Sequence, residues 1–313
     1  MPNMRPEDEV IAIVCSDIHL SHKPPLARSG EPDWYAAMAR PLSELRGLHS
    51  DYGVPVVIAG DIFDRWNSPP ELIRFALDNL PKGAWVIPGQ HDLPYHDYGA
   101  LNRSALGVLI KAGWLKLLHP ETHTTLILGP ENTCLRMTGF AWGMPVQPTD
   151  LGSGLQVAVI HAYCWKQGNS YYDAGEESNV KSFFNQLKGY DVAIFGDNHT
   201  PFEAKSGSLR IFNCGGFMRR KSDEANLRPS CGLLHADGKI TRHYFDISQD
   251  VLERTTDNSL NPIDSSEIEA FVKSLTKLDC DPLDFAAQLR IVTEKESRSH
   301  VQQILRELAD AYQ

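Results

Sequence analysis

The chain has 313 residues, which is enough for one large α/β domain with an appendage or for two domains. Hydrophobic residues make up 42% and charged residues 22% of it, as in ordinary soluble proteins, and no apolar run approaches the roughly 20 residues that a membrane helix needs. The net charge of −10 argues against a broad basic face that grips nucleic acid, but it does not exclude a metal site that handles phosphates.

The cysteines and the N-terminus indicate a cellular compartment. The 6 cysteines contain no C-x-x-C pair, which argues against a zinc ribbon and favours free thiols in a reducing environment. The polar, acidic N-terminus is unlike a signal peptide. We therefore expect a cytoplasmic protein that does not bind a membrane.

The first third of the chain alternates strand and helix patterns. Apolar runs predict strands, and apolar residues at helical spacing predict helices. In chain order the elements are a strand at Val10–Cys15, a helix at Asp33–His49, a strand at Val54–Ala59, a helix at Pro69–Leu80, a strand at Ala84–Ile87 and a helix at Leu101–Ala112. Pro41 lies inside the first helix and should kink or divide it.

The next part of the chain is richer in strand patterns. Strands are expected at Trp114–Leu118, Thr124–Leu128, Cys134–Phe140, Leu155–Ile160 and Val192–Phe195, with a helix at Ser178–Leu187. Two hairpins follow, at Phe202–Phe212 and Gly232–Asp246, the second turning at Asp237-Gly238. The pattern indicates an α/β protein.

The composition changes near residue 250. We predict a main domain at residues 1–250, a turn-rich linker at 251–263 and a helical region at 264–313. Capping signals start three short amphipathic helices in that region, at Asp264, Asp281 and Ser299.

Side chains of the kinds that bind metals follow five of the predicted strands. They are Asp17 and His19; Asp61 and Asp64; Gln90, His91 and Asp92; His161; and Asp197 and His199. Each alone is more often a turn residue, a helix cap or a partly buried histidine. Because strand ends meet at one edge of an α/β sheet, five together favour a shared site. Oxygen and nitrogen donors without thiolate suit Mn²⁺, Fe²⁺ or Zn²⁺.

The order of these motifs resembles the D-x-H, G-D-x-x-D, G-N-H-D, H and G-H-x-H blocks of calcineurin-like metallophosphoesterases, over about residues 10–246. The resemblance implies a four-layer α/β/β/α sandwich, here with a small C-terminal helical appendage, and a two-metal centre that activates water. The implied ligands of the first ion are Asp17, His19, Asp61 and His199. The second ion would share Asp61 and add Gln90, His161 and Asp197.

Two positions depart from the family pattern, and both belong to the second ion. Gln90 stands where the family has Asn, and Asp197 stands where it has the first His of G-H-x-H. One interpretation is a site retuned toward hard ions, because a carboxylate is a harder donor than an imidazole. The other is a weakened second site. We expect two divalent ions, Mn²⁺ in the first place, with Mg²⁺, Fe²⁺ or Zn²⁺ as alternatives.

The remaining polar residues of the motifs have expected roles around the metals. The resemblance makes His91 the candidate general acid, with Asp64 as a catalytic-site residue that, like Asp92, orients ligands or loops. Arg65, Arg219 and Arg220 are candidate phosphate-binding residues, with salt bridges or a solvated loop as the alternative.

The substrate is suggested by a second, looser resemblance. The segments HLSHKPPLARSGEPDWYAAMARPL and NCGGFMRR look like those of SbcD-type nuclease subunits of the phage or prophage kind. This resemblance implies a DNA substrate and an SMC-like ATPase partner that could bind the C-terminal helices. The alternatives are a phosphodiesterase or phosphatase for nucleotides or lipid-linked pyrophosphates, and a non-catalytic binding module with a degenerate second site.

Overall fold

The computed structural model describes residues 9–119, 123–128, 133–150, 152–167 and 174–252. The chain divides into two units, residues 1–255 and 256–313, and every described residue lies in the first. The three predicted C-terminal helices and most of the predicted linker lie outside the described residues. The domain boundaries at residues 250 and 264 therefore stay a prediction.

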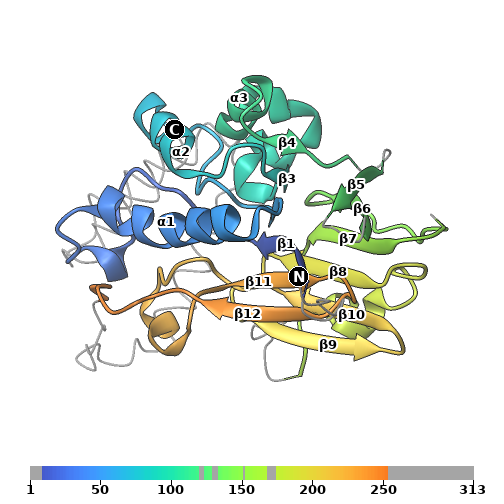
Figure 1. The fold of residues 1–313 in the computed structure, drawn as a ribbon. Coiled ribbons are helices and arrows are strands. Elements are labelled where there is room, and N and C mark those ends of the chain that lie inside the picture. Colours follow the sequence, from blue (N-terminus) through green and yellow to red (C-terminus); the bar gives the residue numbers. More distant parts are fainter. Residues whose placement is uncertain (1–8, 120–122, 129–132, 151, 168–173, 253–313) are drawn as a thin grey trace, which may run out of the picture. The chain divides into compact units, whose positions relative to one another are not determined.

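The first sheet of the described residues has the strand order β12-β11-β1-β2-β3-β4 (Figure 1). Its strands are β1 (Val10–Cys15), β2 (Val56–Ala59), β3 (Trp85–Ile87), β4 (Lys116–Leu117), β11 (Ser230–His235) and β12 (Ile240–Tyr244). Strands β1 to β4 run parallel, while β11 pairs antiparallel with both β1 and β12. The carboxyl ends of β1, β2 and β3 therefore lie next to one another.

The second sheet has the order β5-β6-β7-β8-β10-β9. Its strands are β5 (Thr124–Leu128), β6 (Thr133–Phe140), β7 (Leu155–His161), β8 (Val192–Gly196), β9 (Phe202–Ser206) and β10 (Leu209–Asn213). The four central strands are parallel, and the two edge strands are antiparallel. Both predicted hairpins, β9–β10 and β11–β12, are confirmed.

Both faces of the central strands are buried, which explains why they read as unbroken apolar runs. In β1, Ile13 and Cys15 pack in the cluster that holds the helices, whereas Ala12 and Val14 pack against side chains of the second sheet. The alternation follows from the period of two along a strand. One part of the core therefore lies between the two sheets, and another lies between the first sheet and its helices.

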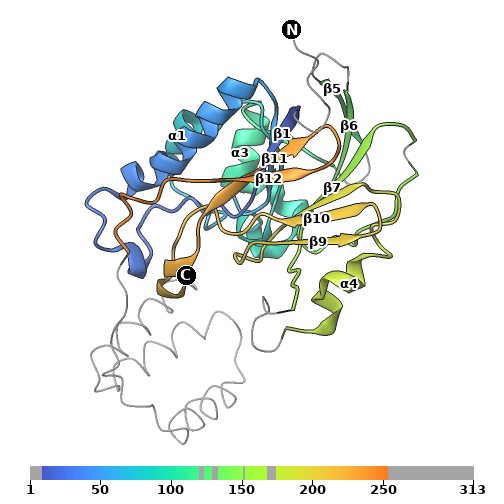
Figure 2. The ribbon, with the colours of Figure 1, turned by 60° about the horizontal axis from the view of Figure 1, so that its bottom comes forward.

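Helices cover the outer faces of both sheets. They are α1 (Trp34–Tyr52), α2 (Pro70–Asn79), α3 (Ala105–Lys111) and α4 (Val180–Phe183). The first three bury their apolar faces in one cluster with the first sheet, and α4 packs in the cluster on the far face of the second. Figure 2 shows α1 and α3 on one side of the strands and α4 on the other. The predicted α/β/β/α sandwich is confirmed.

Pro41 does not divide α1, which runs unbroken for 19 residues. The proline costs the helix a hydrogen bond, or about 3 kcal/mol. Burial of Met38, Leu42 and Leu45 on the same face offsets this cost, because each buried aliphatic side chain contributes about 1.5–3 kcal/mol. Asp33 caps the helix start by accepting a hydrogen bond from the Ala36 amide. Of the two outcomes predicted for Pro41, a kink or a division of the helix, the division was wrong.

Two predicted helices are shorter than their apolar patterns suggested. The segment predicted at Leu101–Ala112 is a 3₁₀ helix at Tyr98–Arg103 and then α3, separated by Ser104 in an extended conformation. The Ser104 hydroxyl accepts a hydrogen bond from the Gly107 amide, so a local cap interrupts the helical pattern. The segment predicted at Ser178–Leu187 contains α4 alone as α-helix. None of the helices in the described ranges is long and apolar enough to cross a membrane.

Candidate metal centre

The five predicted strand ends meet at one place, where the carboxyl ends of β1, β2 and β3 face those of β7 and β8. Backbone hydrogen bonds hold the loops after β1 and β2 side by side, from the Asp17 amide to Gly60 O at 3.1 Å and from the His19 amide to Asp61 O at 2.9 Å. Across the two sheets, the Asp197 amide donates to Asp17 Oδ1 at 3.1 Å. The site is therefore assembled by both sheets.

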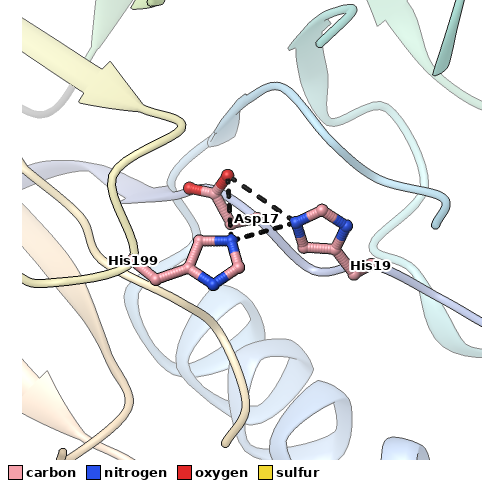
Figure 3. A group of neighbouring side chains, drawn as sticks. All are labelled: Asp17, His19 and His199. Carbon is pink, nitrogen blue, oxygen red and sulfur yellow. Dashed lines mark hydrogen bonds and ion pairs between the residues drawn. The ribbon is translucent and has the colours of Figure 1, made fainter. Parts of the chain in front are cut away.

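One group of ligand atoms belongs to Asp17, His19 and His199, whose ligand atoms lie within 4.8 Å of one another (Figure 3). The two Nε2 atoms are 3.1 Å apart, and each lies 3.9 Å from Asp17 Oδ1. The Nδ1 atom of His199 lies 3.2 Å from Glu224 Oε1, to which it donates. The Nε2 atoms of His19 and His199 thus face the space between these two side chains and Asp17.

This spacing fits a shared divalent ion. Two nitrogens bound at about 2.0–2.2 Å to one ion are about 3.0–3.5 Å apart, which matches the two histidines. Burial lowers the pKa of His19; burial also opposes protonation of His199, but the hydrogen bond to Glu224 raises the pKa of His199. A bound ion would compete with protons for these nitrogens.

A second group consists of Asp17, Asp61 and His161, all of them buried. His161 Nδ1 donates to Ala59 O at 2.6 Å, which turns Nε2 toward Asp61 Oδ2 at 3.4 Å. This Nε2 atom is buried and makes no hydrogen bond, and its charged neighbour is Asp61. Such an atom is costly unless something else binds it, and a cation is the partner that suits an imidazole lone pair beside a carboxylate.

Asp61 and His161 each favour the charged form of the other. Burial by itself lowers the pKa of an imidazole, but the Asp61 carboxylate raises the pKa of His161 to about 10. Burial likewise disfavours ionised Asp61, but His161 and His19 hold its pKa well below the usual range. Asp61 is thus ionised over the neutral range, as a ligand shared by two ions would need to be.

Two glycines of the motifs leave room for these ligands. A Cβ atom at Gly60 would lie 2.1 Å from His161 Nδ1, and one at Gly89 would lie 2.1 Å from Asp61 Oδ1. Gly60 also has a φ of +89°, which favours glycine. The G-D and P-G dipeptides are therefore required by close approach, and not only by the turns that they make.

The backbone of the site is strained at several non-glycine residues. Positive φ angles of 54°, 48°, 50° and 85° occur at Asp17, His19, Asp61 and Asp197. Each costs energy for a residue with a side chain, and such conformations concentrate at functional sites. The fold holds these four residues in place at a cost, as expected for a preorganised site.

A family model described as calcineurin-like phosphoesterase matches residues 12–201. The chain belongs to this family. The family is one of metal-dependent phosphoesterases, and the Asp and His clusters are groups that could hold divalent ions. A comparison with curated proteins finds no match.

Solved structures resemble the phosphoesterase at low sequence identity. An archaeal phosphodiesterase is 11% identical, over 75% of this chain and 99% of its own, with a TM-score of 0.38. The sulfate thiohydrolase SoxB of Thermus thermophilus is 12% identical, over 87% and 61%, with a TM-score of 0.45. The calcineurin-like phosphoesterase YfkN of Bacillus subtilis is 14% identical, over 78% and 92%, with a TM-score of 0.44. Similarities this distant say nothing about the substrate of this chain.

His91 lies beside the metal cluster of the phosphoesterase without being enclosed by it. His19, Asp64 and His91 form a third group of close ligand atoms. His91 Nδ1 donates to the backbone oxygen of Asp64 at 2.9 Å, and Nε2 lies 4.0 Å from Asp61 Oδ2. The His91 side chain is 44% exposed, so a substrate can reach its Nε2 atom.

Asp92 joins two of the loops that carry ligands. It is 0% exposed, and it accepts hydrogen bonds from the amides of Ile62, Phe63 and Gly89 at 2.9–3.1 Å. Burial and the nearby Asp61 charge raise the pKa of Asp92 to about 7. These contacts are of the kind expected for a residue that orients the two loops.

The structure separates the three candidate arginines. Arg65 is exposed. Arg219 is engaged by Asp250, at 2.9 Å, and by backbone oxygens, and these contacts are those of a structural ion pair. Arg220 Nη1 lies 2.8 Å from Asp64 Oδ1 at the edge of the cluster, and its side chain is 13% exposed. Phosphate binding stays a prediction for all three.

Glu224 is a residue of the site that the motifs did not reveal. Its Oε1 accepts from His199 Nδ1 at 3.2 Å, and its Oε2 accepts from the amides of Arg220 and Lys221. These bonds hold the pKa of Glu224 below its usual range, although burial opposes this. Glu224 fixes the tautomer and direction of His199. No sequence signal links it to the site, because it lies 25 residues from His199.

Replacement of Glu224 with glutamine is expected to weaken the most tightly bound ion by about 10–100-fold, because His199 loses its charged partner. Calorimetric titration of the metal-free protein with Mn²⁺ measures this. The control is Asp223→Asn, which changes an exposed carboxylate next to it. Equal affinity in the two variants would show that Glu224 does not act on the metal through His199.

Proposed function

We propose that the chain is a two-ion phosphodiesterase that cleaves DNA, of the SbcD nuclease type. The observation that carries the proposal is that two groups of close ligand atoms share Asp17, and that the exposed His91 lies beside Asp61. Two groups that share a carboxylate suit two neighbouring ions. An exposed imidazole beside them suits proton transfer to a leaving oxygen.

The proposed ligand sets combine the sequence motifs with the groups of close ligand atoms. The first ion would be held by Asp17, His19, Asp61 and His199, and the second by Asp61, Gln90 and His161, with Asp197 as the further predicted ligand. When bound, divalent ions supply Lewis-acid activation of water and neutralise phosphate charge. Oxygen donors outnumber nitrogen donors around the second ion, so we propose Mn²⁺.

His91 would act on the leaving group. Its Nδ1–H is held by the Asp64 carbonyl, so Nε2 is the atom that is free to face the substrate. A protonated His91 would hand the Nε2 proton to the leaving oxygen as the P–O bond breaks. A diester needs this help because the leaving oxygen is otherwise expelled as an alkoxide.

An aromatic pair supports a nucleic acid as the substrate. Tyr95 is 82% exposed, and its ring lies 6.2 Å from that of Trp66. These residues follow His91 and Asp64 closely in the chain, and exposed aromatic rings stack on nucleobases. The net charge of −10 fits a subunit whose grip on DNA comes mainly from a partner, for which we propose an SMC-like ATPase in the cytoplasm.

Cleavage assays on four substrates test the proposal. The purified protein with Mn²⁺ is given bis-p-nitrophenyl phosphate, p-nitrophenyl phosphate, and labelled single- and double-stranded linear DNA. We expect cleavage of the diester and of DNA. Activity on the monoester alone would identify a phosphatase, and cleavage of the synthetic diester without DNA would favour a small-molecule phosphodiesterase. No cleavage with any divalent ion would favour a binding module.

A further inference from the structure

The two residues that depart from the family pattern contact each other. Gln90 Nε2 donates to Asp197 Oδ1 at 2.8 Å, although the two residues are 107 positions apart in the chain. They come from different sheets, since Gln90 follows β3 and Asp197 follows β8. The contact therefore depends on the fold as a whole, and it joins the two altered positions directly.

The contact determines which way the Gln90 amide faces. A carboxylate accepts hydrogen bonds and donates none, so the NH₂ group must point toward Asp197 and the oxygen away from it. The Gln90 Oε1 atom is buried and has no hydrogen-bond partner. His161 Nε2 also makes no hydrogen bond, although it lies 3.4 Å from Asp61 Oδ2. The Gln90 amide oxygen is therefore a donor available to a cation, as the imidazole of His161 is in the proposed ligand set.

The backbone fixes the position of Asp197. Its amide donates to both carboxylate oxygens of Asp17, at 3.1 and 3.2 Å, and its φ is +85°. The Asp197 carboxylate also lies outside the three groups of mutually close Asp and His ligand atoms in the described ranges. These observations suit a residue that orients a neighbouring side chain. They suit a direct metal ligand less well.

We infer that Gln90 and Asp197 act as one unit, in which Asp197 is a positioning residue that turns the Gln90 oxygen toward the second ion. The inference rests on the second ion of the proposed function. The two departures then compensate each other: Gln90 reaches one methylene further than Asn, and the short Asp197 side chain leaves the space that an imidazole would fill. Each residue suits the other and not the family's usual partner.

Changes at the two positions should therefore be strongly non-additive. Gln90→Asn withdraws the amide from the carboxylate, and Asp197→His places a ring where the amide lies. We expect either variant to bind the second ion at least about tenfold more weakly. The double variant Gln90→Asn/Asp197→His combines a short amide with an imidazole and should bind two ions again. Asp197→Asn keeps an acceptor for Gln90 and should lose less than Asp197→Ala.

The test measures metal binding and needs no substrate. Metal-free proteins are titrated with Mn²⁺ by calorimetry, and bound ions are counted by mass spectrometry after dialysis. Asp237→Asn, in the exposed turn between β11 and β12, is the control and should bind two ions like the wild type. Circular dichroism confirms that each variant is folded.

The results separate this inference from the proposed function. If the wild type and both single variants bind two ions with equal affinity, Gln90 and Asp197 do not act as one unit. The two-ion centre would remain intact in that case. A double variant whose loss equals the sum of the single losses would also overturn the unit. A wild type that binds one ion would contradict the two-ion centre, and the inference with it. Loss in the single variants and recovery in the double variant would establish the unit.

Discussion

Replacement of His91 with alanine is expected to lower kcat for a phosphodiester by about 10²–10⁴-fold, the range for loss of a general acid. The reason is that the exposed His91 side chain lies beside Asp61, whereas His19 and His161 are buried. The metal content should not change, because His91 is not placed among the ligands of either ion. Steady-state rates with bis-p-nitrophenyl phosphate, together with a metal count, measure both quantities.

A matched control separates this effect from a general loss of histidine. His123 is an exposed histidine directly before β5, and His123→Ala should keep full activity. A His91→Ala variant that loses ions as well as activity would identify His91 as a ligand. A variant that keeps most of its activity would remove His91 from the proposed mechanism.

Replacement of Asp92 with alanine is expected to lower the free energy of unfolding by at least about 3 kcal/mol. Three backbone amides, of Ile62, Phe63 and Gly89, would lose their buried acceptor, and each orphaned group costs about 1–3 kcal/mol. Urea unfolding of the metal-free protein measures this effect without a contribution from bound ions.

The control for this stability effect is Asp51→Ala, which removes an exposed carboxylate near the end of α1. Its free energy of unfolding should change by no more than about 0.5 kcal/mol. If Asp92→Ala were equally mild, then Asp92 would not hold the two loops together. The Asp92 variant should also bind ions more weakly, because the loops that it joins carry Asp61 and Gln90.

Local patterns were informative wherever one physical rule dominated. The buried central strands of both sheets were predicted because strands covered on both faces form unbroken apolar runs. The hairpin at Asp237-Gly238 was predicted because glycine supplies the φ of +79° that the turn needs. Predictions were wrong where opposing contributions to the stability of a helix were similar in size. Helix packing outweighed the cost of Pro41, and the Ser104 cap outweighed a continuous apolar pattern.

The order of the residues was enough to predict the fold class, the family and the residues that gather at the candidate metal centre. It could do so because strand ends of parallel sheets share an edge, and because each motif places its ligand directly after a strand. The amino-acid types alone also marked Gln90 and Asp197 as departures. Nothing in the order of residues, however, indicated that these two side chains touch.

The contacts around the ligands depend on the tertiary structure. It placed Glu224 on His199 and joined Gln90 to Asp197, across 25 and 107 residues of chain. It also pairs Arg219 with Asp250 in an ion pair. Hydrogen bonds between side chains that are distant in sequence depend on how the two sheets pack. Local secondary-structure propensities do not predict that packing.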